Sequence, residues 1–208
     1  STSTRKYRIL VGNGYAQGMP KKRVDLEALT SAAMAVADRD GFERLALTGV
    51  AAELDVAAST LYTHTDGLDG LKYLVAVAAT GNLTEAVRKC AIGTSGLDAL
   101  TAMAIAYRAF ALDHPGQFTS TLLAPRSKDD ELATANKALL EVFELVYRAT
   151  GLDAQEAPLA ARAMRSSIHG FLALEQITDP PSEHDAEYRY LLDALQRGLL
   201  HSPADIAG

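Results

Sequence analysis

The chain has 208 residues, of which 48% are hydrophobic and 22% are charged, and its formal net charge is −6. This composition is typical of a soluble globular protein of one or two domains, and the net acidity excludes a surface coated with charge for binding nucleic acids. A single cysteine, Cys90, excludes an internal disulfide, and no apolar run reaches the length of a membrane span, so we expect a cytoplasmic protein without membrane contact.

Residues 1–23 are predicted to be a flexible arm, since they contain four glycine or proline positions and no helical period. The arm has no acidic residue, and its basic residues are Arg5, Lys6, Arg8, Lys21, Lys22 and Arg23. Residues 25–75, in contrast, hold three basic and nine acidic residues. On charge alone the arm suits contact with DNA phosphates and the following segment does not, although the arm also fits a merely solvated tail.

A helical pattern begins at Asp25 and is expected to end near Gly41, where a glycine suits the terminus of a helix. The apolar spacing then predicts three more helices, over residues 47–54, 59–64 and 68–90. A turn at residues 55–56 separates the first two of these. We therefore expect a three-helix domain over residues 24–75, followed by a longer fourth helix.

The rest of the chain is predicted to be helical as well. Pro115 stops one helix, and Ser127 with Asp130 resembles a capping box that opens another. The predicted helices cover residues 97–114, 127–150, 153–176 and 183–200. The fold class is therefore all-α, with a second helical domain over residues 76–208.

Residues 50–68, VAAELDVAASTLYTHTDGL, have the spacing of two short helices that cross at a steep angle. Ala51 and Ala57 are small enough for a close crossing, and Val50 and Leu61 are placed to lock it with apolar contacts. The second helix of such a pair projects its N-terminal residues outward, where the major groove of DNA can receive them. The pattern indicates a helix-turn-helix.

The segment DGFERLALTGVAAELDVAASTLYTHTDGLDGL resembles the N-terminal domain of the tetracycline-repressor (TetR) family of transcriptional regulators. The matching positions are Gly41-Phe42 after the first helix, Ala51 in the second, and the tetrad of residues 61–64, Leu-Tyr-Thr-His. Further on, AYRAFALDHPGQF and AMRSSIHGFLALE are similar to the ligand-binding domain of the branch known for a Trp-His-Gly motif, with Ile168 before His169-Gly170. The resemblance covers about residues 24–176.

Five positions depart from the family pattern. Ala46 replaces the Ser or Thr that usually caps the second helix, and Thr48 stands where an arginine is common. Residues 55–57, Asp-Val-Ala, replace glycine-valine-serine, and Leu68 replaces a phosphate-contacting lysine. Because each change removes a cap, a charge or a donor, we expect the fold to stand and operator binding to need the charges of the basic arm.

The residues predicted to contact DNA offer hydrogen bonds, methyl groups or positive charge. In the helix-turn-helix they are Thr48, Ala57, Ala58, Ser59, Thr60, Tyr62, Thr63 and His64, and the six basic residues of the arm complete the set. Tyr62 and His64 resemble the phosphate-contacting pair of the family. For Tyr62 we expect packing under the recognition helix together with phosphate contact, and the alternative is packing alone. For His64 the alternative is an exposed position without a role.

In the second domain the resemblance implies an effector pocket between the fourth helix and the middle of the domain. Its predicted lining combines aromatic and methionine side chains with polar tips: Met103, Tyr107, Phe110, Phe118, Leu122, Phe143, Tyr147, Met164, Arg165 and His169. Such a pocket suits a small, largely apolar molecule. The same residues at helical spacing are also typical of an ordinary core.

The last two predicted helices are rich in apolar residues on more than one face, as APLAARAMRSSIHGFLALEQI at residues 157–177 illustrates. Two such helices from each protomer would form a four-helix bundle, so we expect a homodimer. The alternative is a monomer that buries both helices internally.

The resemblance implies a homodimeric, ligand-responsive transcriptional regulator, which we expect to be a repressor. A small molecule would release it from a double-stranded DNA operator. The alternative is a ligand-binding or interaction protein on a TetR-like scaffold, with weak or no DNA binding. We expect no enzyme, cofactor or metal site, because the sequence shows no paired carboxylates, His/Cys cluster or Ser-His-Asp pattern.

Overall fold

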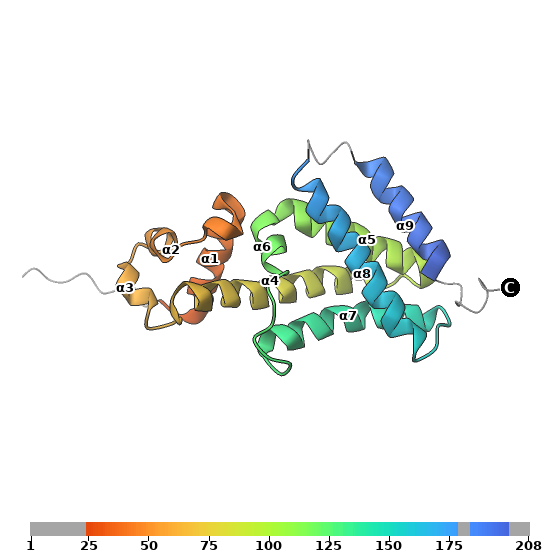
Figure 1. The fold of residues 1–208 in the computed structure, drawn as a ribbon, viewed down its shortest axis with the longest axis horizontal. Helices are drawn as coiled ribbons and strands as arrows, with labels where there is room; N and C mark the ends of the chain where they lie inside the picture. The colour runs from red at the N-terminus through yellow and green to blue at the C-terminus, as the bar shows by residue number, and fades with distance from the viewer. Residues whose placement is uncertain (1–23, 179–183, 200–208) are drawn as a thin grey trace, which may run out of the picture.

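The computed structural model describes residues 24–178 and 184–199, and the regular elements of this part of the chain are helices, which confirms the all-α fold class. They are α1 (Leu26–Asp40), η1 (Phe42–Arg44), α2 (Leu47–Leu54), α3 (Ala58–Leu61), α4 (Gly67–Ala91), α5 (Gly96–Asp113), α6 (Pro115–Ser120), α7 (Glu131–Ala149), α8 (Glu156–Glu175) and α9 (Asp185–Leu199). Helices α1 to α3 lie at one end of an elongated molecule and α5 to α9 at the other, with α4 running from one end into the other (Figure 1).

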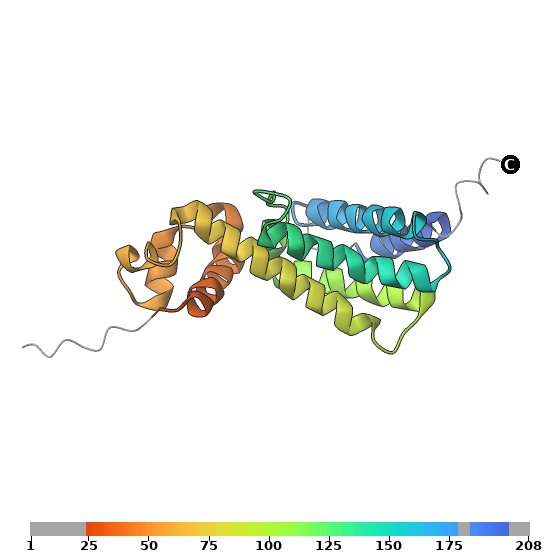
Figure 2. The same ribbon diagram turned by 90° about the horizontal axis from the view of Figure 1, so that it is seen from below.

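Each end of the molecule has its own hydrophobic core. The first core packs α1, α2 and α3 against the N-terminal half of α4, which contributes Leu71 and Val75. The second core packs α5 to α9 against the C-terminal half of α4, which contributes Leu83 and Val87. Figure 2 shows α7 lying between α4 and α8 in this second bundle. Since one helix serves both cores, the orientation of each end depends on α4.

Helix α1 begins and ends where its sequence predicts. The Asp25 carboxylate caps the helix by accepting a hydrogen bond from the Ala28 backbone N–H at 2.8 Å. At the other end Gly41 has φ 95°, a conformation that a residue without a Cβ adopts readily. Between them Leu29, Ala33 and Val36 face the first core, as the apolar stripe predicts.

The turn between α2 and α3 is held by Asp55, which adopts the left-handed conformation at φ 56° and ψ 50°. Aspartate tolerates this region better than most residues, so it can take the place of the family's glycine without losing the turn. Helix α3 is shorter than the predicted residues 59–64. It has no side-chain cap at Ala57, and the Thr63 hydroxyl donates to the Thr60 carbonyl at 2.7 Å, a local bond that competes with helix propagation.

In the second half the predicted α5, α7, α8 and α9 are confirmed, with two differences. Helix α7 begins at Glu131 rather than near Ser127, because the Asp130 carboxylate caps it by accepting from the Ala133 N–H at 2.7 Å. Helix α6 is not predicted by the sequence analysis, which assigned Pro115 only to the end of α5. Pro115 in fact occupies the first turn of α6, where a proline loses no hydrogen bond.

None of the described helices combines the length and the apolarity needed to cross a membrane.

Candidate functional sites

The predicted DNA-contacting residues of the helix-turn-helix lie together on α2, α3 and the turn after α3, at one end of the molecule (Figure 1). Thr48, Ser59 and Thr63 are exposed, and Tyr62 is 62% exposed. Tyr62 therefore does not pack under the recognition helix, and the packing predicted for it, with or without phosphate contact, is corrected. Four more members of the set, Ala57, Ala58, Thr60 and His64, are exposed or half-buried.

The crossing of α2 and α3 is fixed from below by two fully buried side chains, Val50 and Leu61. Leu54 and Val56 pack against the same core and complete the predicted apolar lock. Because Leu61 is buried and Tyr62 beside it is exposed, the rotation of α3 about its axis is set by apolar packing. The outward face of α3 then consists of hydroxyl and methyl groups, which suit base edges and thymine methyl groups.

Positive charge is scarce around this face. The basic residues described in residues 24–75 all have local partners: Arg39 pairs with Glu53 at 2.7 Å, Lys72 pairs with Glu43 at 3.5 Å, and Arg44 donates to the Asp40 carbonyl. The side chains of Glu53, Asp55 and Asp69 are exposed. The described surface therefore offers hydrogen-bond donors but little attraction for phosphate, as the charge distribution predicts. The arm residues Arg5, Lys6, Arg8, Lys21, Lys22 and Arg23 lie outside the described residues.

Most residues of the predicted effector pocket converge in the second core. The buried members are Met103, Tyr107, Phe110, Phe118, Phe143, Tyr147, Met164 and His169. Arg165 is half-buried beside them. Leu122 is 63% exposed and does not join them, because α6 ends at Ser120 and the chain then turns outward. The prediction of Leu122 as a lining residue is therefore corrected.

A polar group sits among these aromatic side chains. The Tyr107 hydroxyl lies 3.0 Å from Nδ1 of His169, and the His169 ring stacks on Phe118 with a centroid separation of 4.3 Å. Burial, assisted by the charge of Arg165, lowers the pKa of His169 to about 4, so the ring is neutral at physiological pH. Nε2 of His169 is buried without a hydrogen-bond partner, and so is the Tyr147 hydroxyl.

The two cores are tied together by α6, which packs across the end of α1 (Figure 1). The Asp38 carboxylate of α1 accepts hydrogen bonds from the Gln117 backbone N–H at 2.9 Å and from its side-chain amide at 2.7 Å. It also lies 3.1 Å from Nδ1 of His114. A Cβ on Gly116 would lie 2.0 Å from the Ala37 carbonyl oxygen, so only glycine fits this backbone contact.

A second tie joins the loop after α6 to α4. The Arg126 guanidinium lies over the Tyr73 ring at 4.3 Å and donates to the Asp69 carbonyl at 3.2 Å. The Tyr73 hydroxyl accepts from the Leu132 backbone N–H at 3.2 Å. The sequence predicts neither of these two contacts, because the residues that form each of them lie far apart in the chain. The adjacent residues Pro115 and Gly116 were the one local signal of a special backbone segment.

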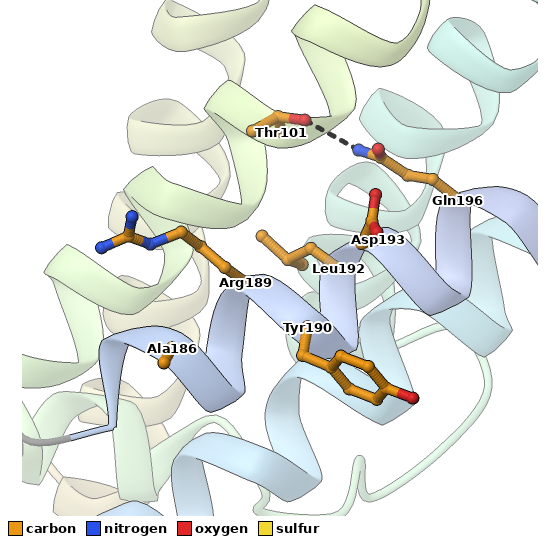
Figure 3. Close-up of a pocket in the computed structure, with 7 residues that line it drawn as sticks. All are labelled: Thr101, Ala186, Arg189, Tyr190, Leu192, Asp193 and Gln196. Atoms are coloured by element: carbon orange, nitrogen blue, oxygen red, sulfur yellow. Dashed lines mark hydrogen bonds between the residues drawn. The ribbon is translucent and has the colours of Figure 1, made fainter.

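Helices α8 and α9 carry an outward face without cover in the described protein. On α8 and just after it, Leu159, Leu174 and Ile177 are 69%, 64% and 80% exposed. A Cβ added to Gly170, midway along that face, would meet no atom within 4 Å. An open hollow of about 470 Å³ lies where α9 packs on α5, lined by Thr101, Ala186, Arg189, Tyr190, Leu192, Asp193 and Gln196 (Figure 3). This hollow contains none of the predicted effector residues.

Residues 100–195 match the family model described as "Tetracyclin repressor-like, C-terminal domain". Among curated proteins, the chain is 29% identical over 154 residues to the uncharacterized HTH-type transcriptional regulator Rv0681 of Mycobacterium tuberculosis (strain ATCC 25618 / H37Rv). That alignment covers 74% of this chain and 71% of the mycobacterial protein.

Two solved structures share the fold at low sequence identity. BioQ with its natural double-stranded DNA operator is 20% identical with a TM-score of 0.65, and the match covers 86% of this chain and 99% of that chain. A TetR variant from Acinetobacter baumannii AYE in complex with minocycline is 19% identical with a TM-score of 0.67, and the match covers 86% of this chain and 100% of that chain.

Proposed function

We infer that this chain is a transcriptional regulator of the TetR family, which binds a double-stranded DNA operator as a homodimer and is released from it by a small molecule. The observation that carries the proposal is the outward face of α2 and α3, held by buried Val50 and Leu61 at the end of a helix that reaches into a second core. The relative crystallised with its DNA operator and the relative bound to minocycline have the same fold. Regulation rather than catalysis is the proposed role.

The basic arm of residues 1–23 is proposed to supply the phosphate contacts that the helix-turn-helix lacks. Arms of this kind reach into the minor groove beside a recognition helix. Since Arg39, Arg44 and Lys72 are engaged within the domain, the arm is the remaining source of charge near the DNA end. Neutralising several phosphates gives affinity that falls steeply with salt concentration.

A gel-shift titration of the full chain and of a chain lacking residues 1–23 tests this role. The probe is the DNA upstream of the protein's own gene. We expect truncation to weaken binding by orders of magnitude and to flatten the salt dependence. Equal affinity and an equal salt slope for both proteins would overturn the arm proposal while leaving the regulator proposal intact.

Dimerisation is proposed to bury the outward face of α8 together with α9. A palindromic operator requires two recognition helices about 34–36 Å apart, which a two-fold dimer supplies. Leu174 and Ile177 are exposed, and no atom lies within 4 Å of a Cβ added to Gly170 on the same face. This face therefore suits close packing against a helix of the partner protomer. Sedimentation of Leu174→Glu should show monomers. Leu145→Glu, at a residue equally exposed on α7, is the matched control and should stay dimeric.

Release is proposed to follow a tilt of α4, since α4 belongs to both cores. An effector in the second core that prefers one position of α7 and α8 would bias the angle of α4 and so the separation of the two recognition helices. A ligand with equal affinity for both states would have no effect.

The acidic surroundings of α3 favour a second candidate, a ligand-binding or interaction protein that has lost tight DNA binding. Glu53, Asp55 and Asp69 are exposed near the recognition helix, and neither α2 nor α3 has a side-chain cap. Gel shifts of the full chain at low and at moderate salt separate the two candidates. Absence of any shift at low salt would favour the second one.

A further inference from the structure

A chain of hydrogen-bonding groups crosses the second core from half-buried to buried positions. Arg165 donates to the Asn136 side-chain oxygen at 2.7 Å, and its positive charge opposes the rise that burial causes in the pKa of the Tyr107 hydroxyl. The Tyr107 hydroxyl in turn lies 3.0 Å from Nδ1 of His169. The chain ends at Nε2 of His169, which is buried and has no partner.

The direction of these bonds determines what the end of the chain can bind. The positive charge of Arg165 acts on the Tyr107 oxygen, which favours turning the hydroxyl lone pairs toward Arg165 and the hydroxyl proton toward Nδ1 of His169. A neutral imidazole that accepts at Nδ1 carries its single proton on Nε2. Nε2 is therefore a buried N–H donor without an acceptor, an arrangement that costs free energy until an acceptor arrives.

Arg165 adds a positive charge beside this donor. None of the ion pairs of the described residues includes Arg165, whereas the other partly buried arginine of the bundle, Arg108, is paired with Glu175 and Asp185. A half-buried cation without a carboxylate partner, one helical turn from an unfilled donor, is a favourable environment for an anionic acceptor. Phe118 and Phe143 pack around Tyr107 and are buried themselves, so a ligand that reaches these apolar rings must part the helices that cover them.

We propose that the effector of this core is a small organic acid, whose carboxylate is bound by Arg165 and by Nε2–H of His169 while its apolar body packs against Phe118 and Phe143. The proposal rests on the proposed function in one respect, namely that the second core holds the effector. It goes beyond that function because it specifies a negative head group. A purely apolar molecule would leave Nε2–H of His169 without an acceptor and Arg165 without a carboxylate partner.

Matched pairs of acids and alcohols test the head group directly. Binding of octanoate against 1-octanol, and of benzoate against benzyl alcohol, is measured calorimetrically on the full chain without DNA. We expect at least one acid to bind about tenfold more tightly than its alcohol, the size of effect expected for one charge-assisted hydrogen bond in place of a neutral one. If neither acid is preferred over its alcohol, the proposal is overturned.

Three variants assign the preference to its residues. Arg165→Gln removes the charge and should abolish the preference for the acid while alcohol binding persists, which also shows that the variant is folded. Arg165→Lys keeps the charge and should keep most of the preference. Arg162→Gln, on the exposed side of α8 one turn earlier, is the matched control and should bind like the parent chain.

A preference for the acid that survives Arg165→Gln would overturn the assignment to this cluster. The outcome is independent of DNA binding, because the calorimetry uses the protein alone. Failure of the gel shifts would contradict the proposed function and leave the acid site standing. Acid binding lost in Arg165→Gln, with operator binding unchanged, would support both.

Discussion

The two ends of the molecule place their candidate functional groups in opposite environments. At the DNA end, Ser59, Tyr62 and Thr63 point outward and the buried residues beneath them are purely apolar. In the second core, Tyr107 and His169 are themselves buried and the site is surrounded by aromatic rings. Substitutions on the outward face of α3 can therefore change DNA sequence preference with little effect on stability. In the second core the same buried atoms determine both ligand selectivity and part of the free energy of folding, so a substitution there changes both.

The contact between the two ends gives the largest expected effect. Gly116→Ala would drive a Cβ into the α1 backbone, at 2.0 Å from the Ala37 carbonyl oxygen. We expect a loss of about 3 kcal/mol or more in the free energy of unfolding, because both partners are backbone and neither can rotate away. Chemical denaturation measures it. Gly81→Ala, on an open face of α4, is the control and should be neutral or slightly stabilising; equal behaviour of the two variants would contradict the close contact.

The contrast between neighbouring residues of α3 is the next largest effect. Leu61→Ala removes a fully buried side chain and should cost about 3 kcal/mol in the free energy of unfolding, because the cavity collapses only in part. Tyr62→Ala, at an exposed position, should change it by less than about 0.5 kcal/mol and weaken operator binding instead. Denaturation and gel shifts on both variants measure the contrast. A large loss of stability in Tyr62→Ala would mean that Tyr62 packs in the core after all.

Acid should destabilise the second core through His169. Its pKa in the folded protein is lowered to about 4, below the value of an unfolded histidine, so the unfolded chain binds a proton first as the pH falls. Stability therefore declines between about pH 6.5 and pH 4, by about 1.5 kcal/mol on reaching pH 5. The measurement is the difference between the parent chain and His169→Gln across this range. A constant difference would show that His169 titrates normally.

The smallest effect is expected at the Asp38 tie. Asp38→Asn keeps the shape but weakens the acceptor of three hydrogen-bonding groups on α5 and α6, which should cost about 1 kcal/mol in the free energy of unfolding. The more informative readout is coupling, since effector binding should release DNA less completely when α6 is loosened from α1. Glu27→Gln, at an exposed residue early in α1, serves as the control. Unchanged release in Asp38→Asn would remove α6 from the communication between the ends.

The sequence predicts the parts of this molecule that depend on local spacing. The stripe of α1, the lock of Val50 and Leu61, and the extent of α4 follow from apolar periodicity, which is a property of neighbouring residues. The glycine at position 116 could not be explained in advance, because the atom that excludes a side chain belongs to residue 37. For the same reason the bond between Tyr107 and His169, 62 positions apart, was beyond reach.

The candidate sites divide along the same line. The outward residues of the helix-turn-helix were predictable because a motif of about twenty residues fixes their direction. The convergence of aromatic residues in the second core was implied by the family resemblance. Which polar atoms stay unpaired there was not predictable, since Nε2 of His169 is left without a partner by the packing of α5, α6 and α8 together. The prediction for Leu122 is wrong because this exposed residue follows a short helix, α6, that the sequence does not predict.

Helix α4 also constrains how such a protein can change over generations. Each residue of a helix advances the chain by about 1.5 Å and turns it by about 100°. Val75 and Leu83 belong to different cores. Inserting or deleting one residue between them would therefore rotate helices α1 to α3 by about 100° relative to the second core. The length of this stretch is therefore fixed, and any recombinant that joins the front of one homologue to the back of another must cross over without gaining or losing a residue here.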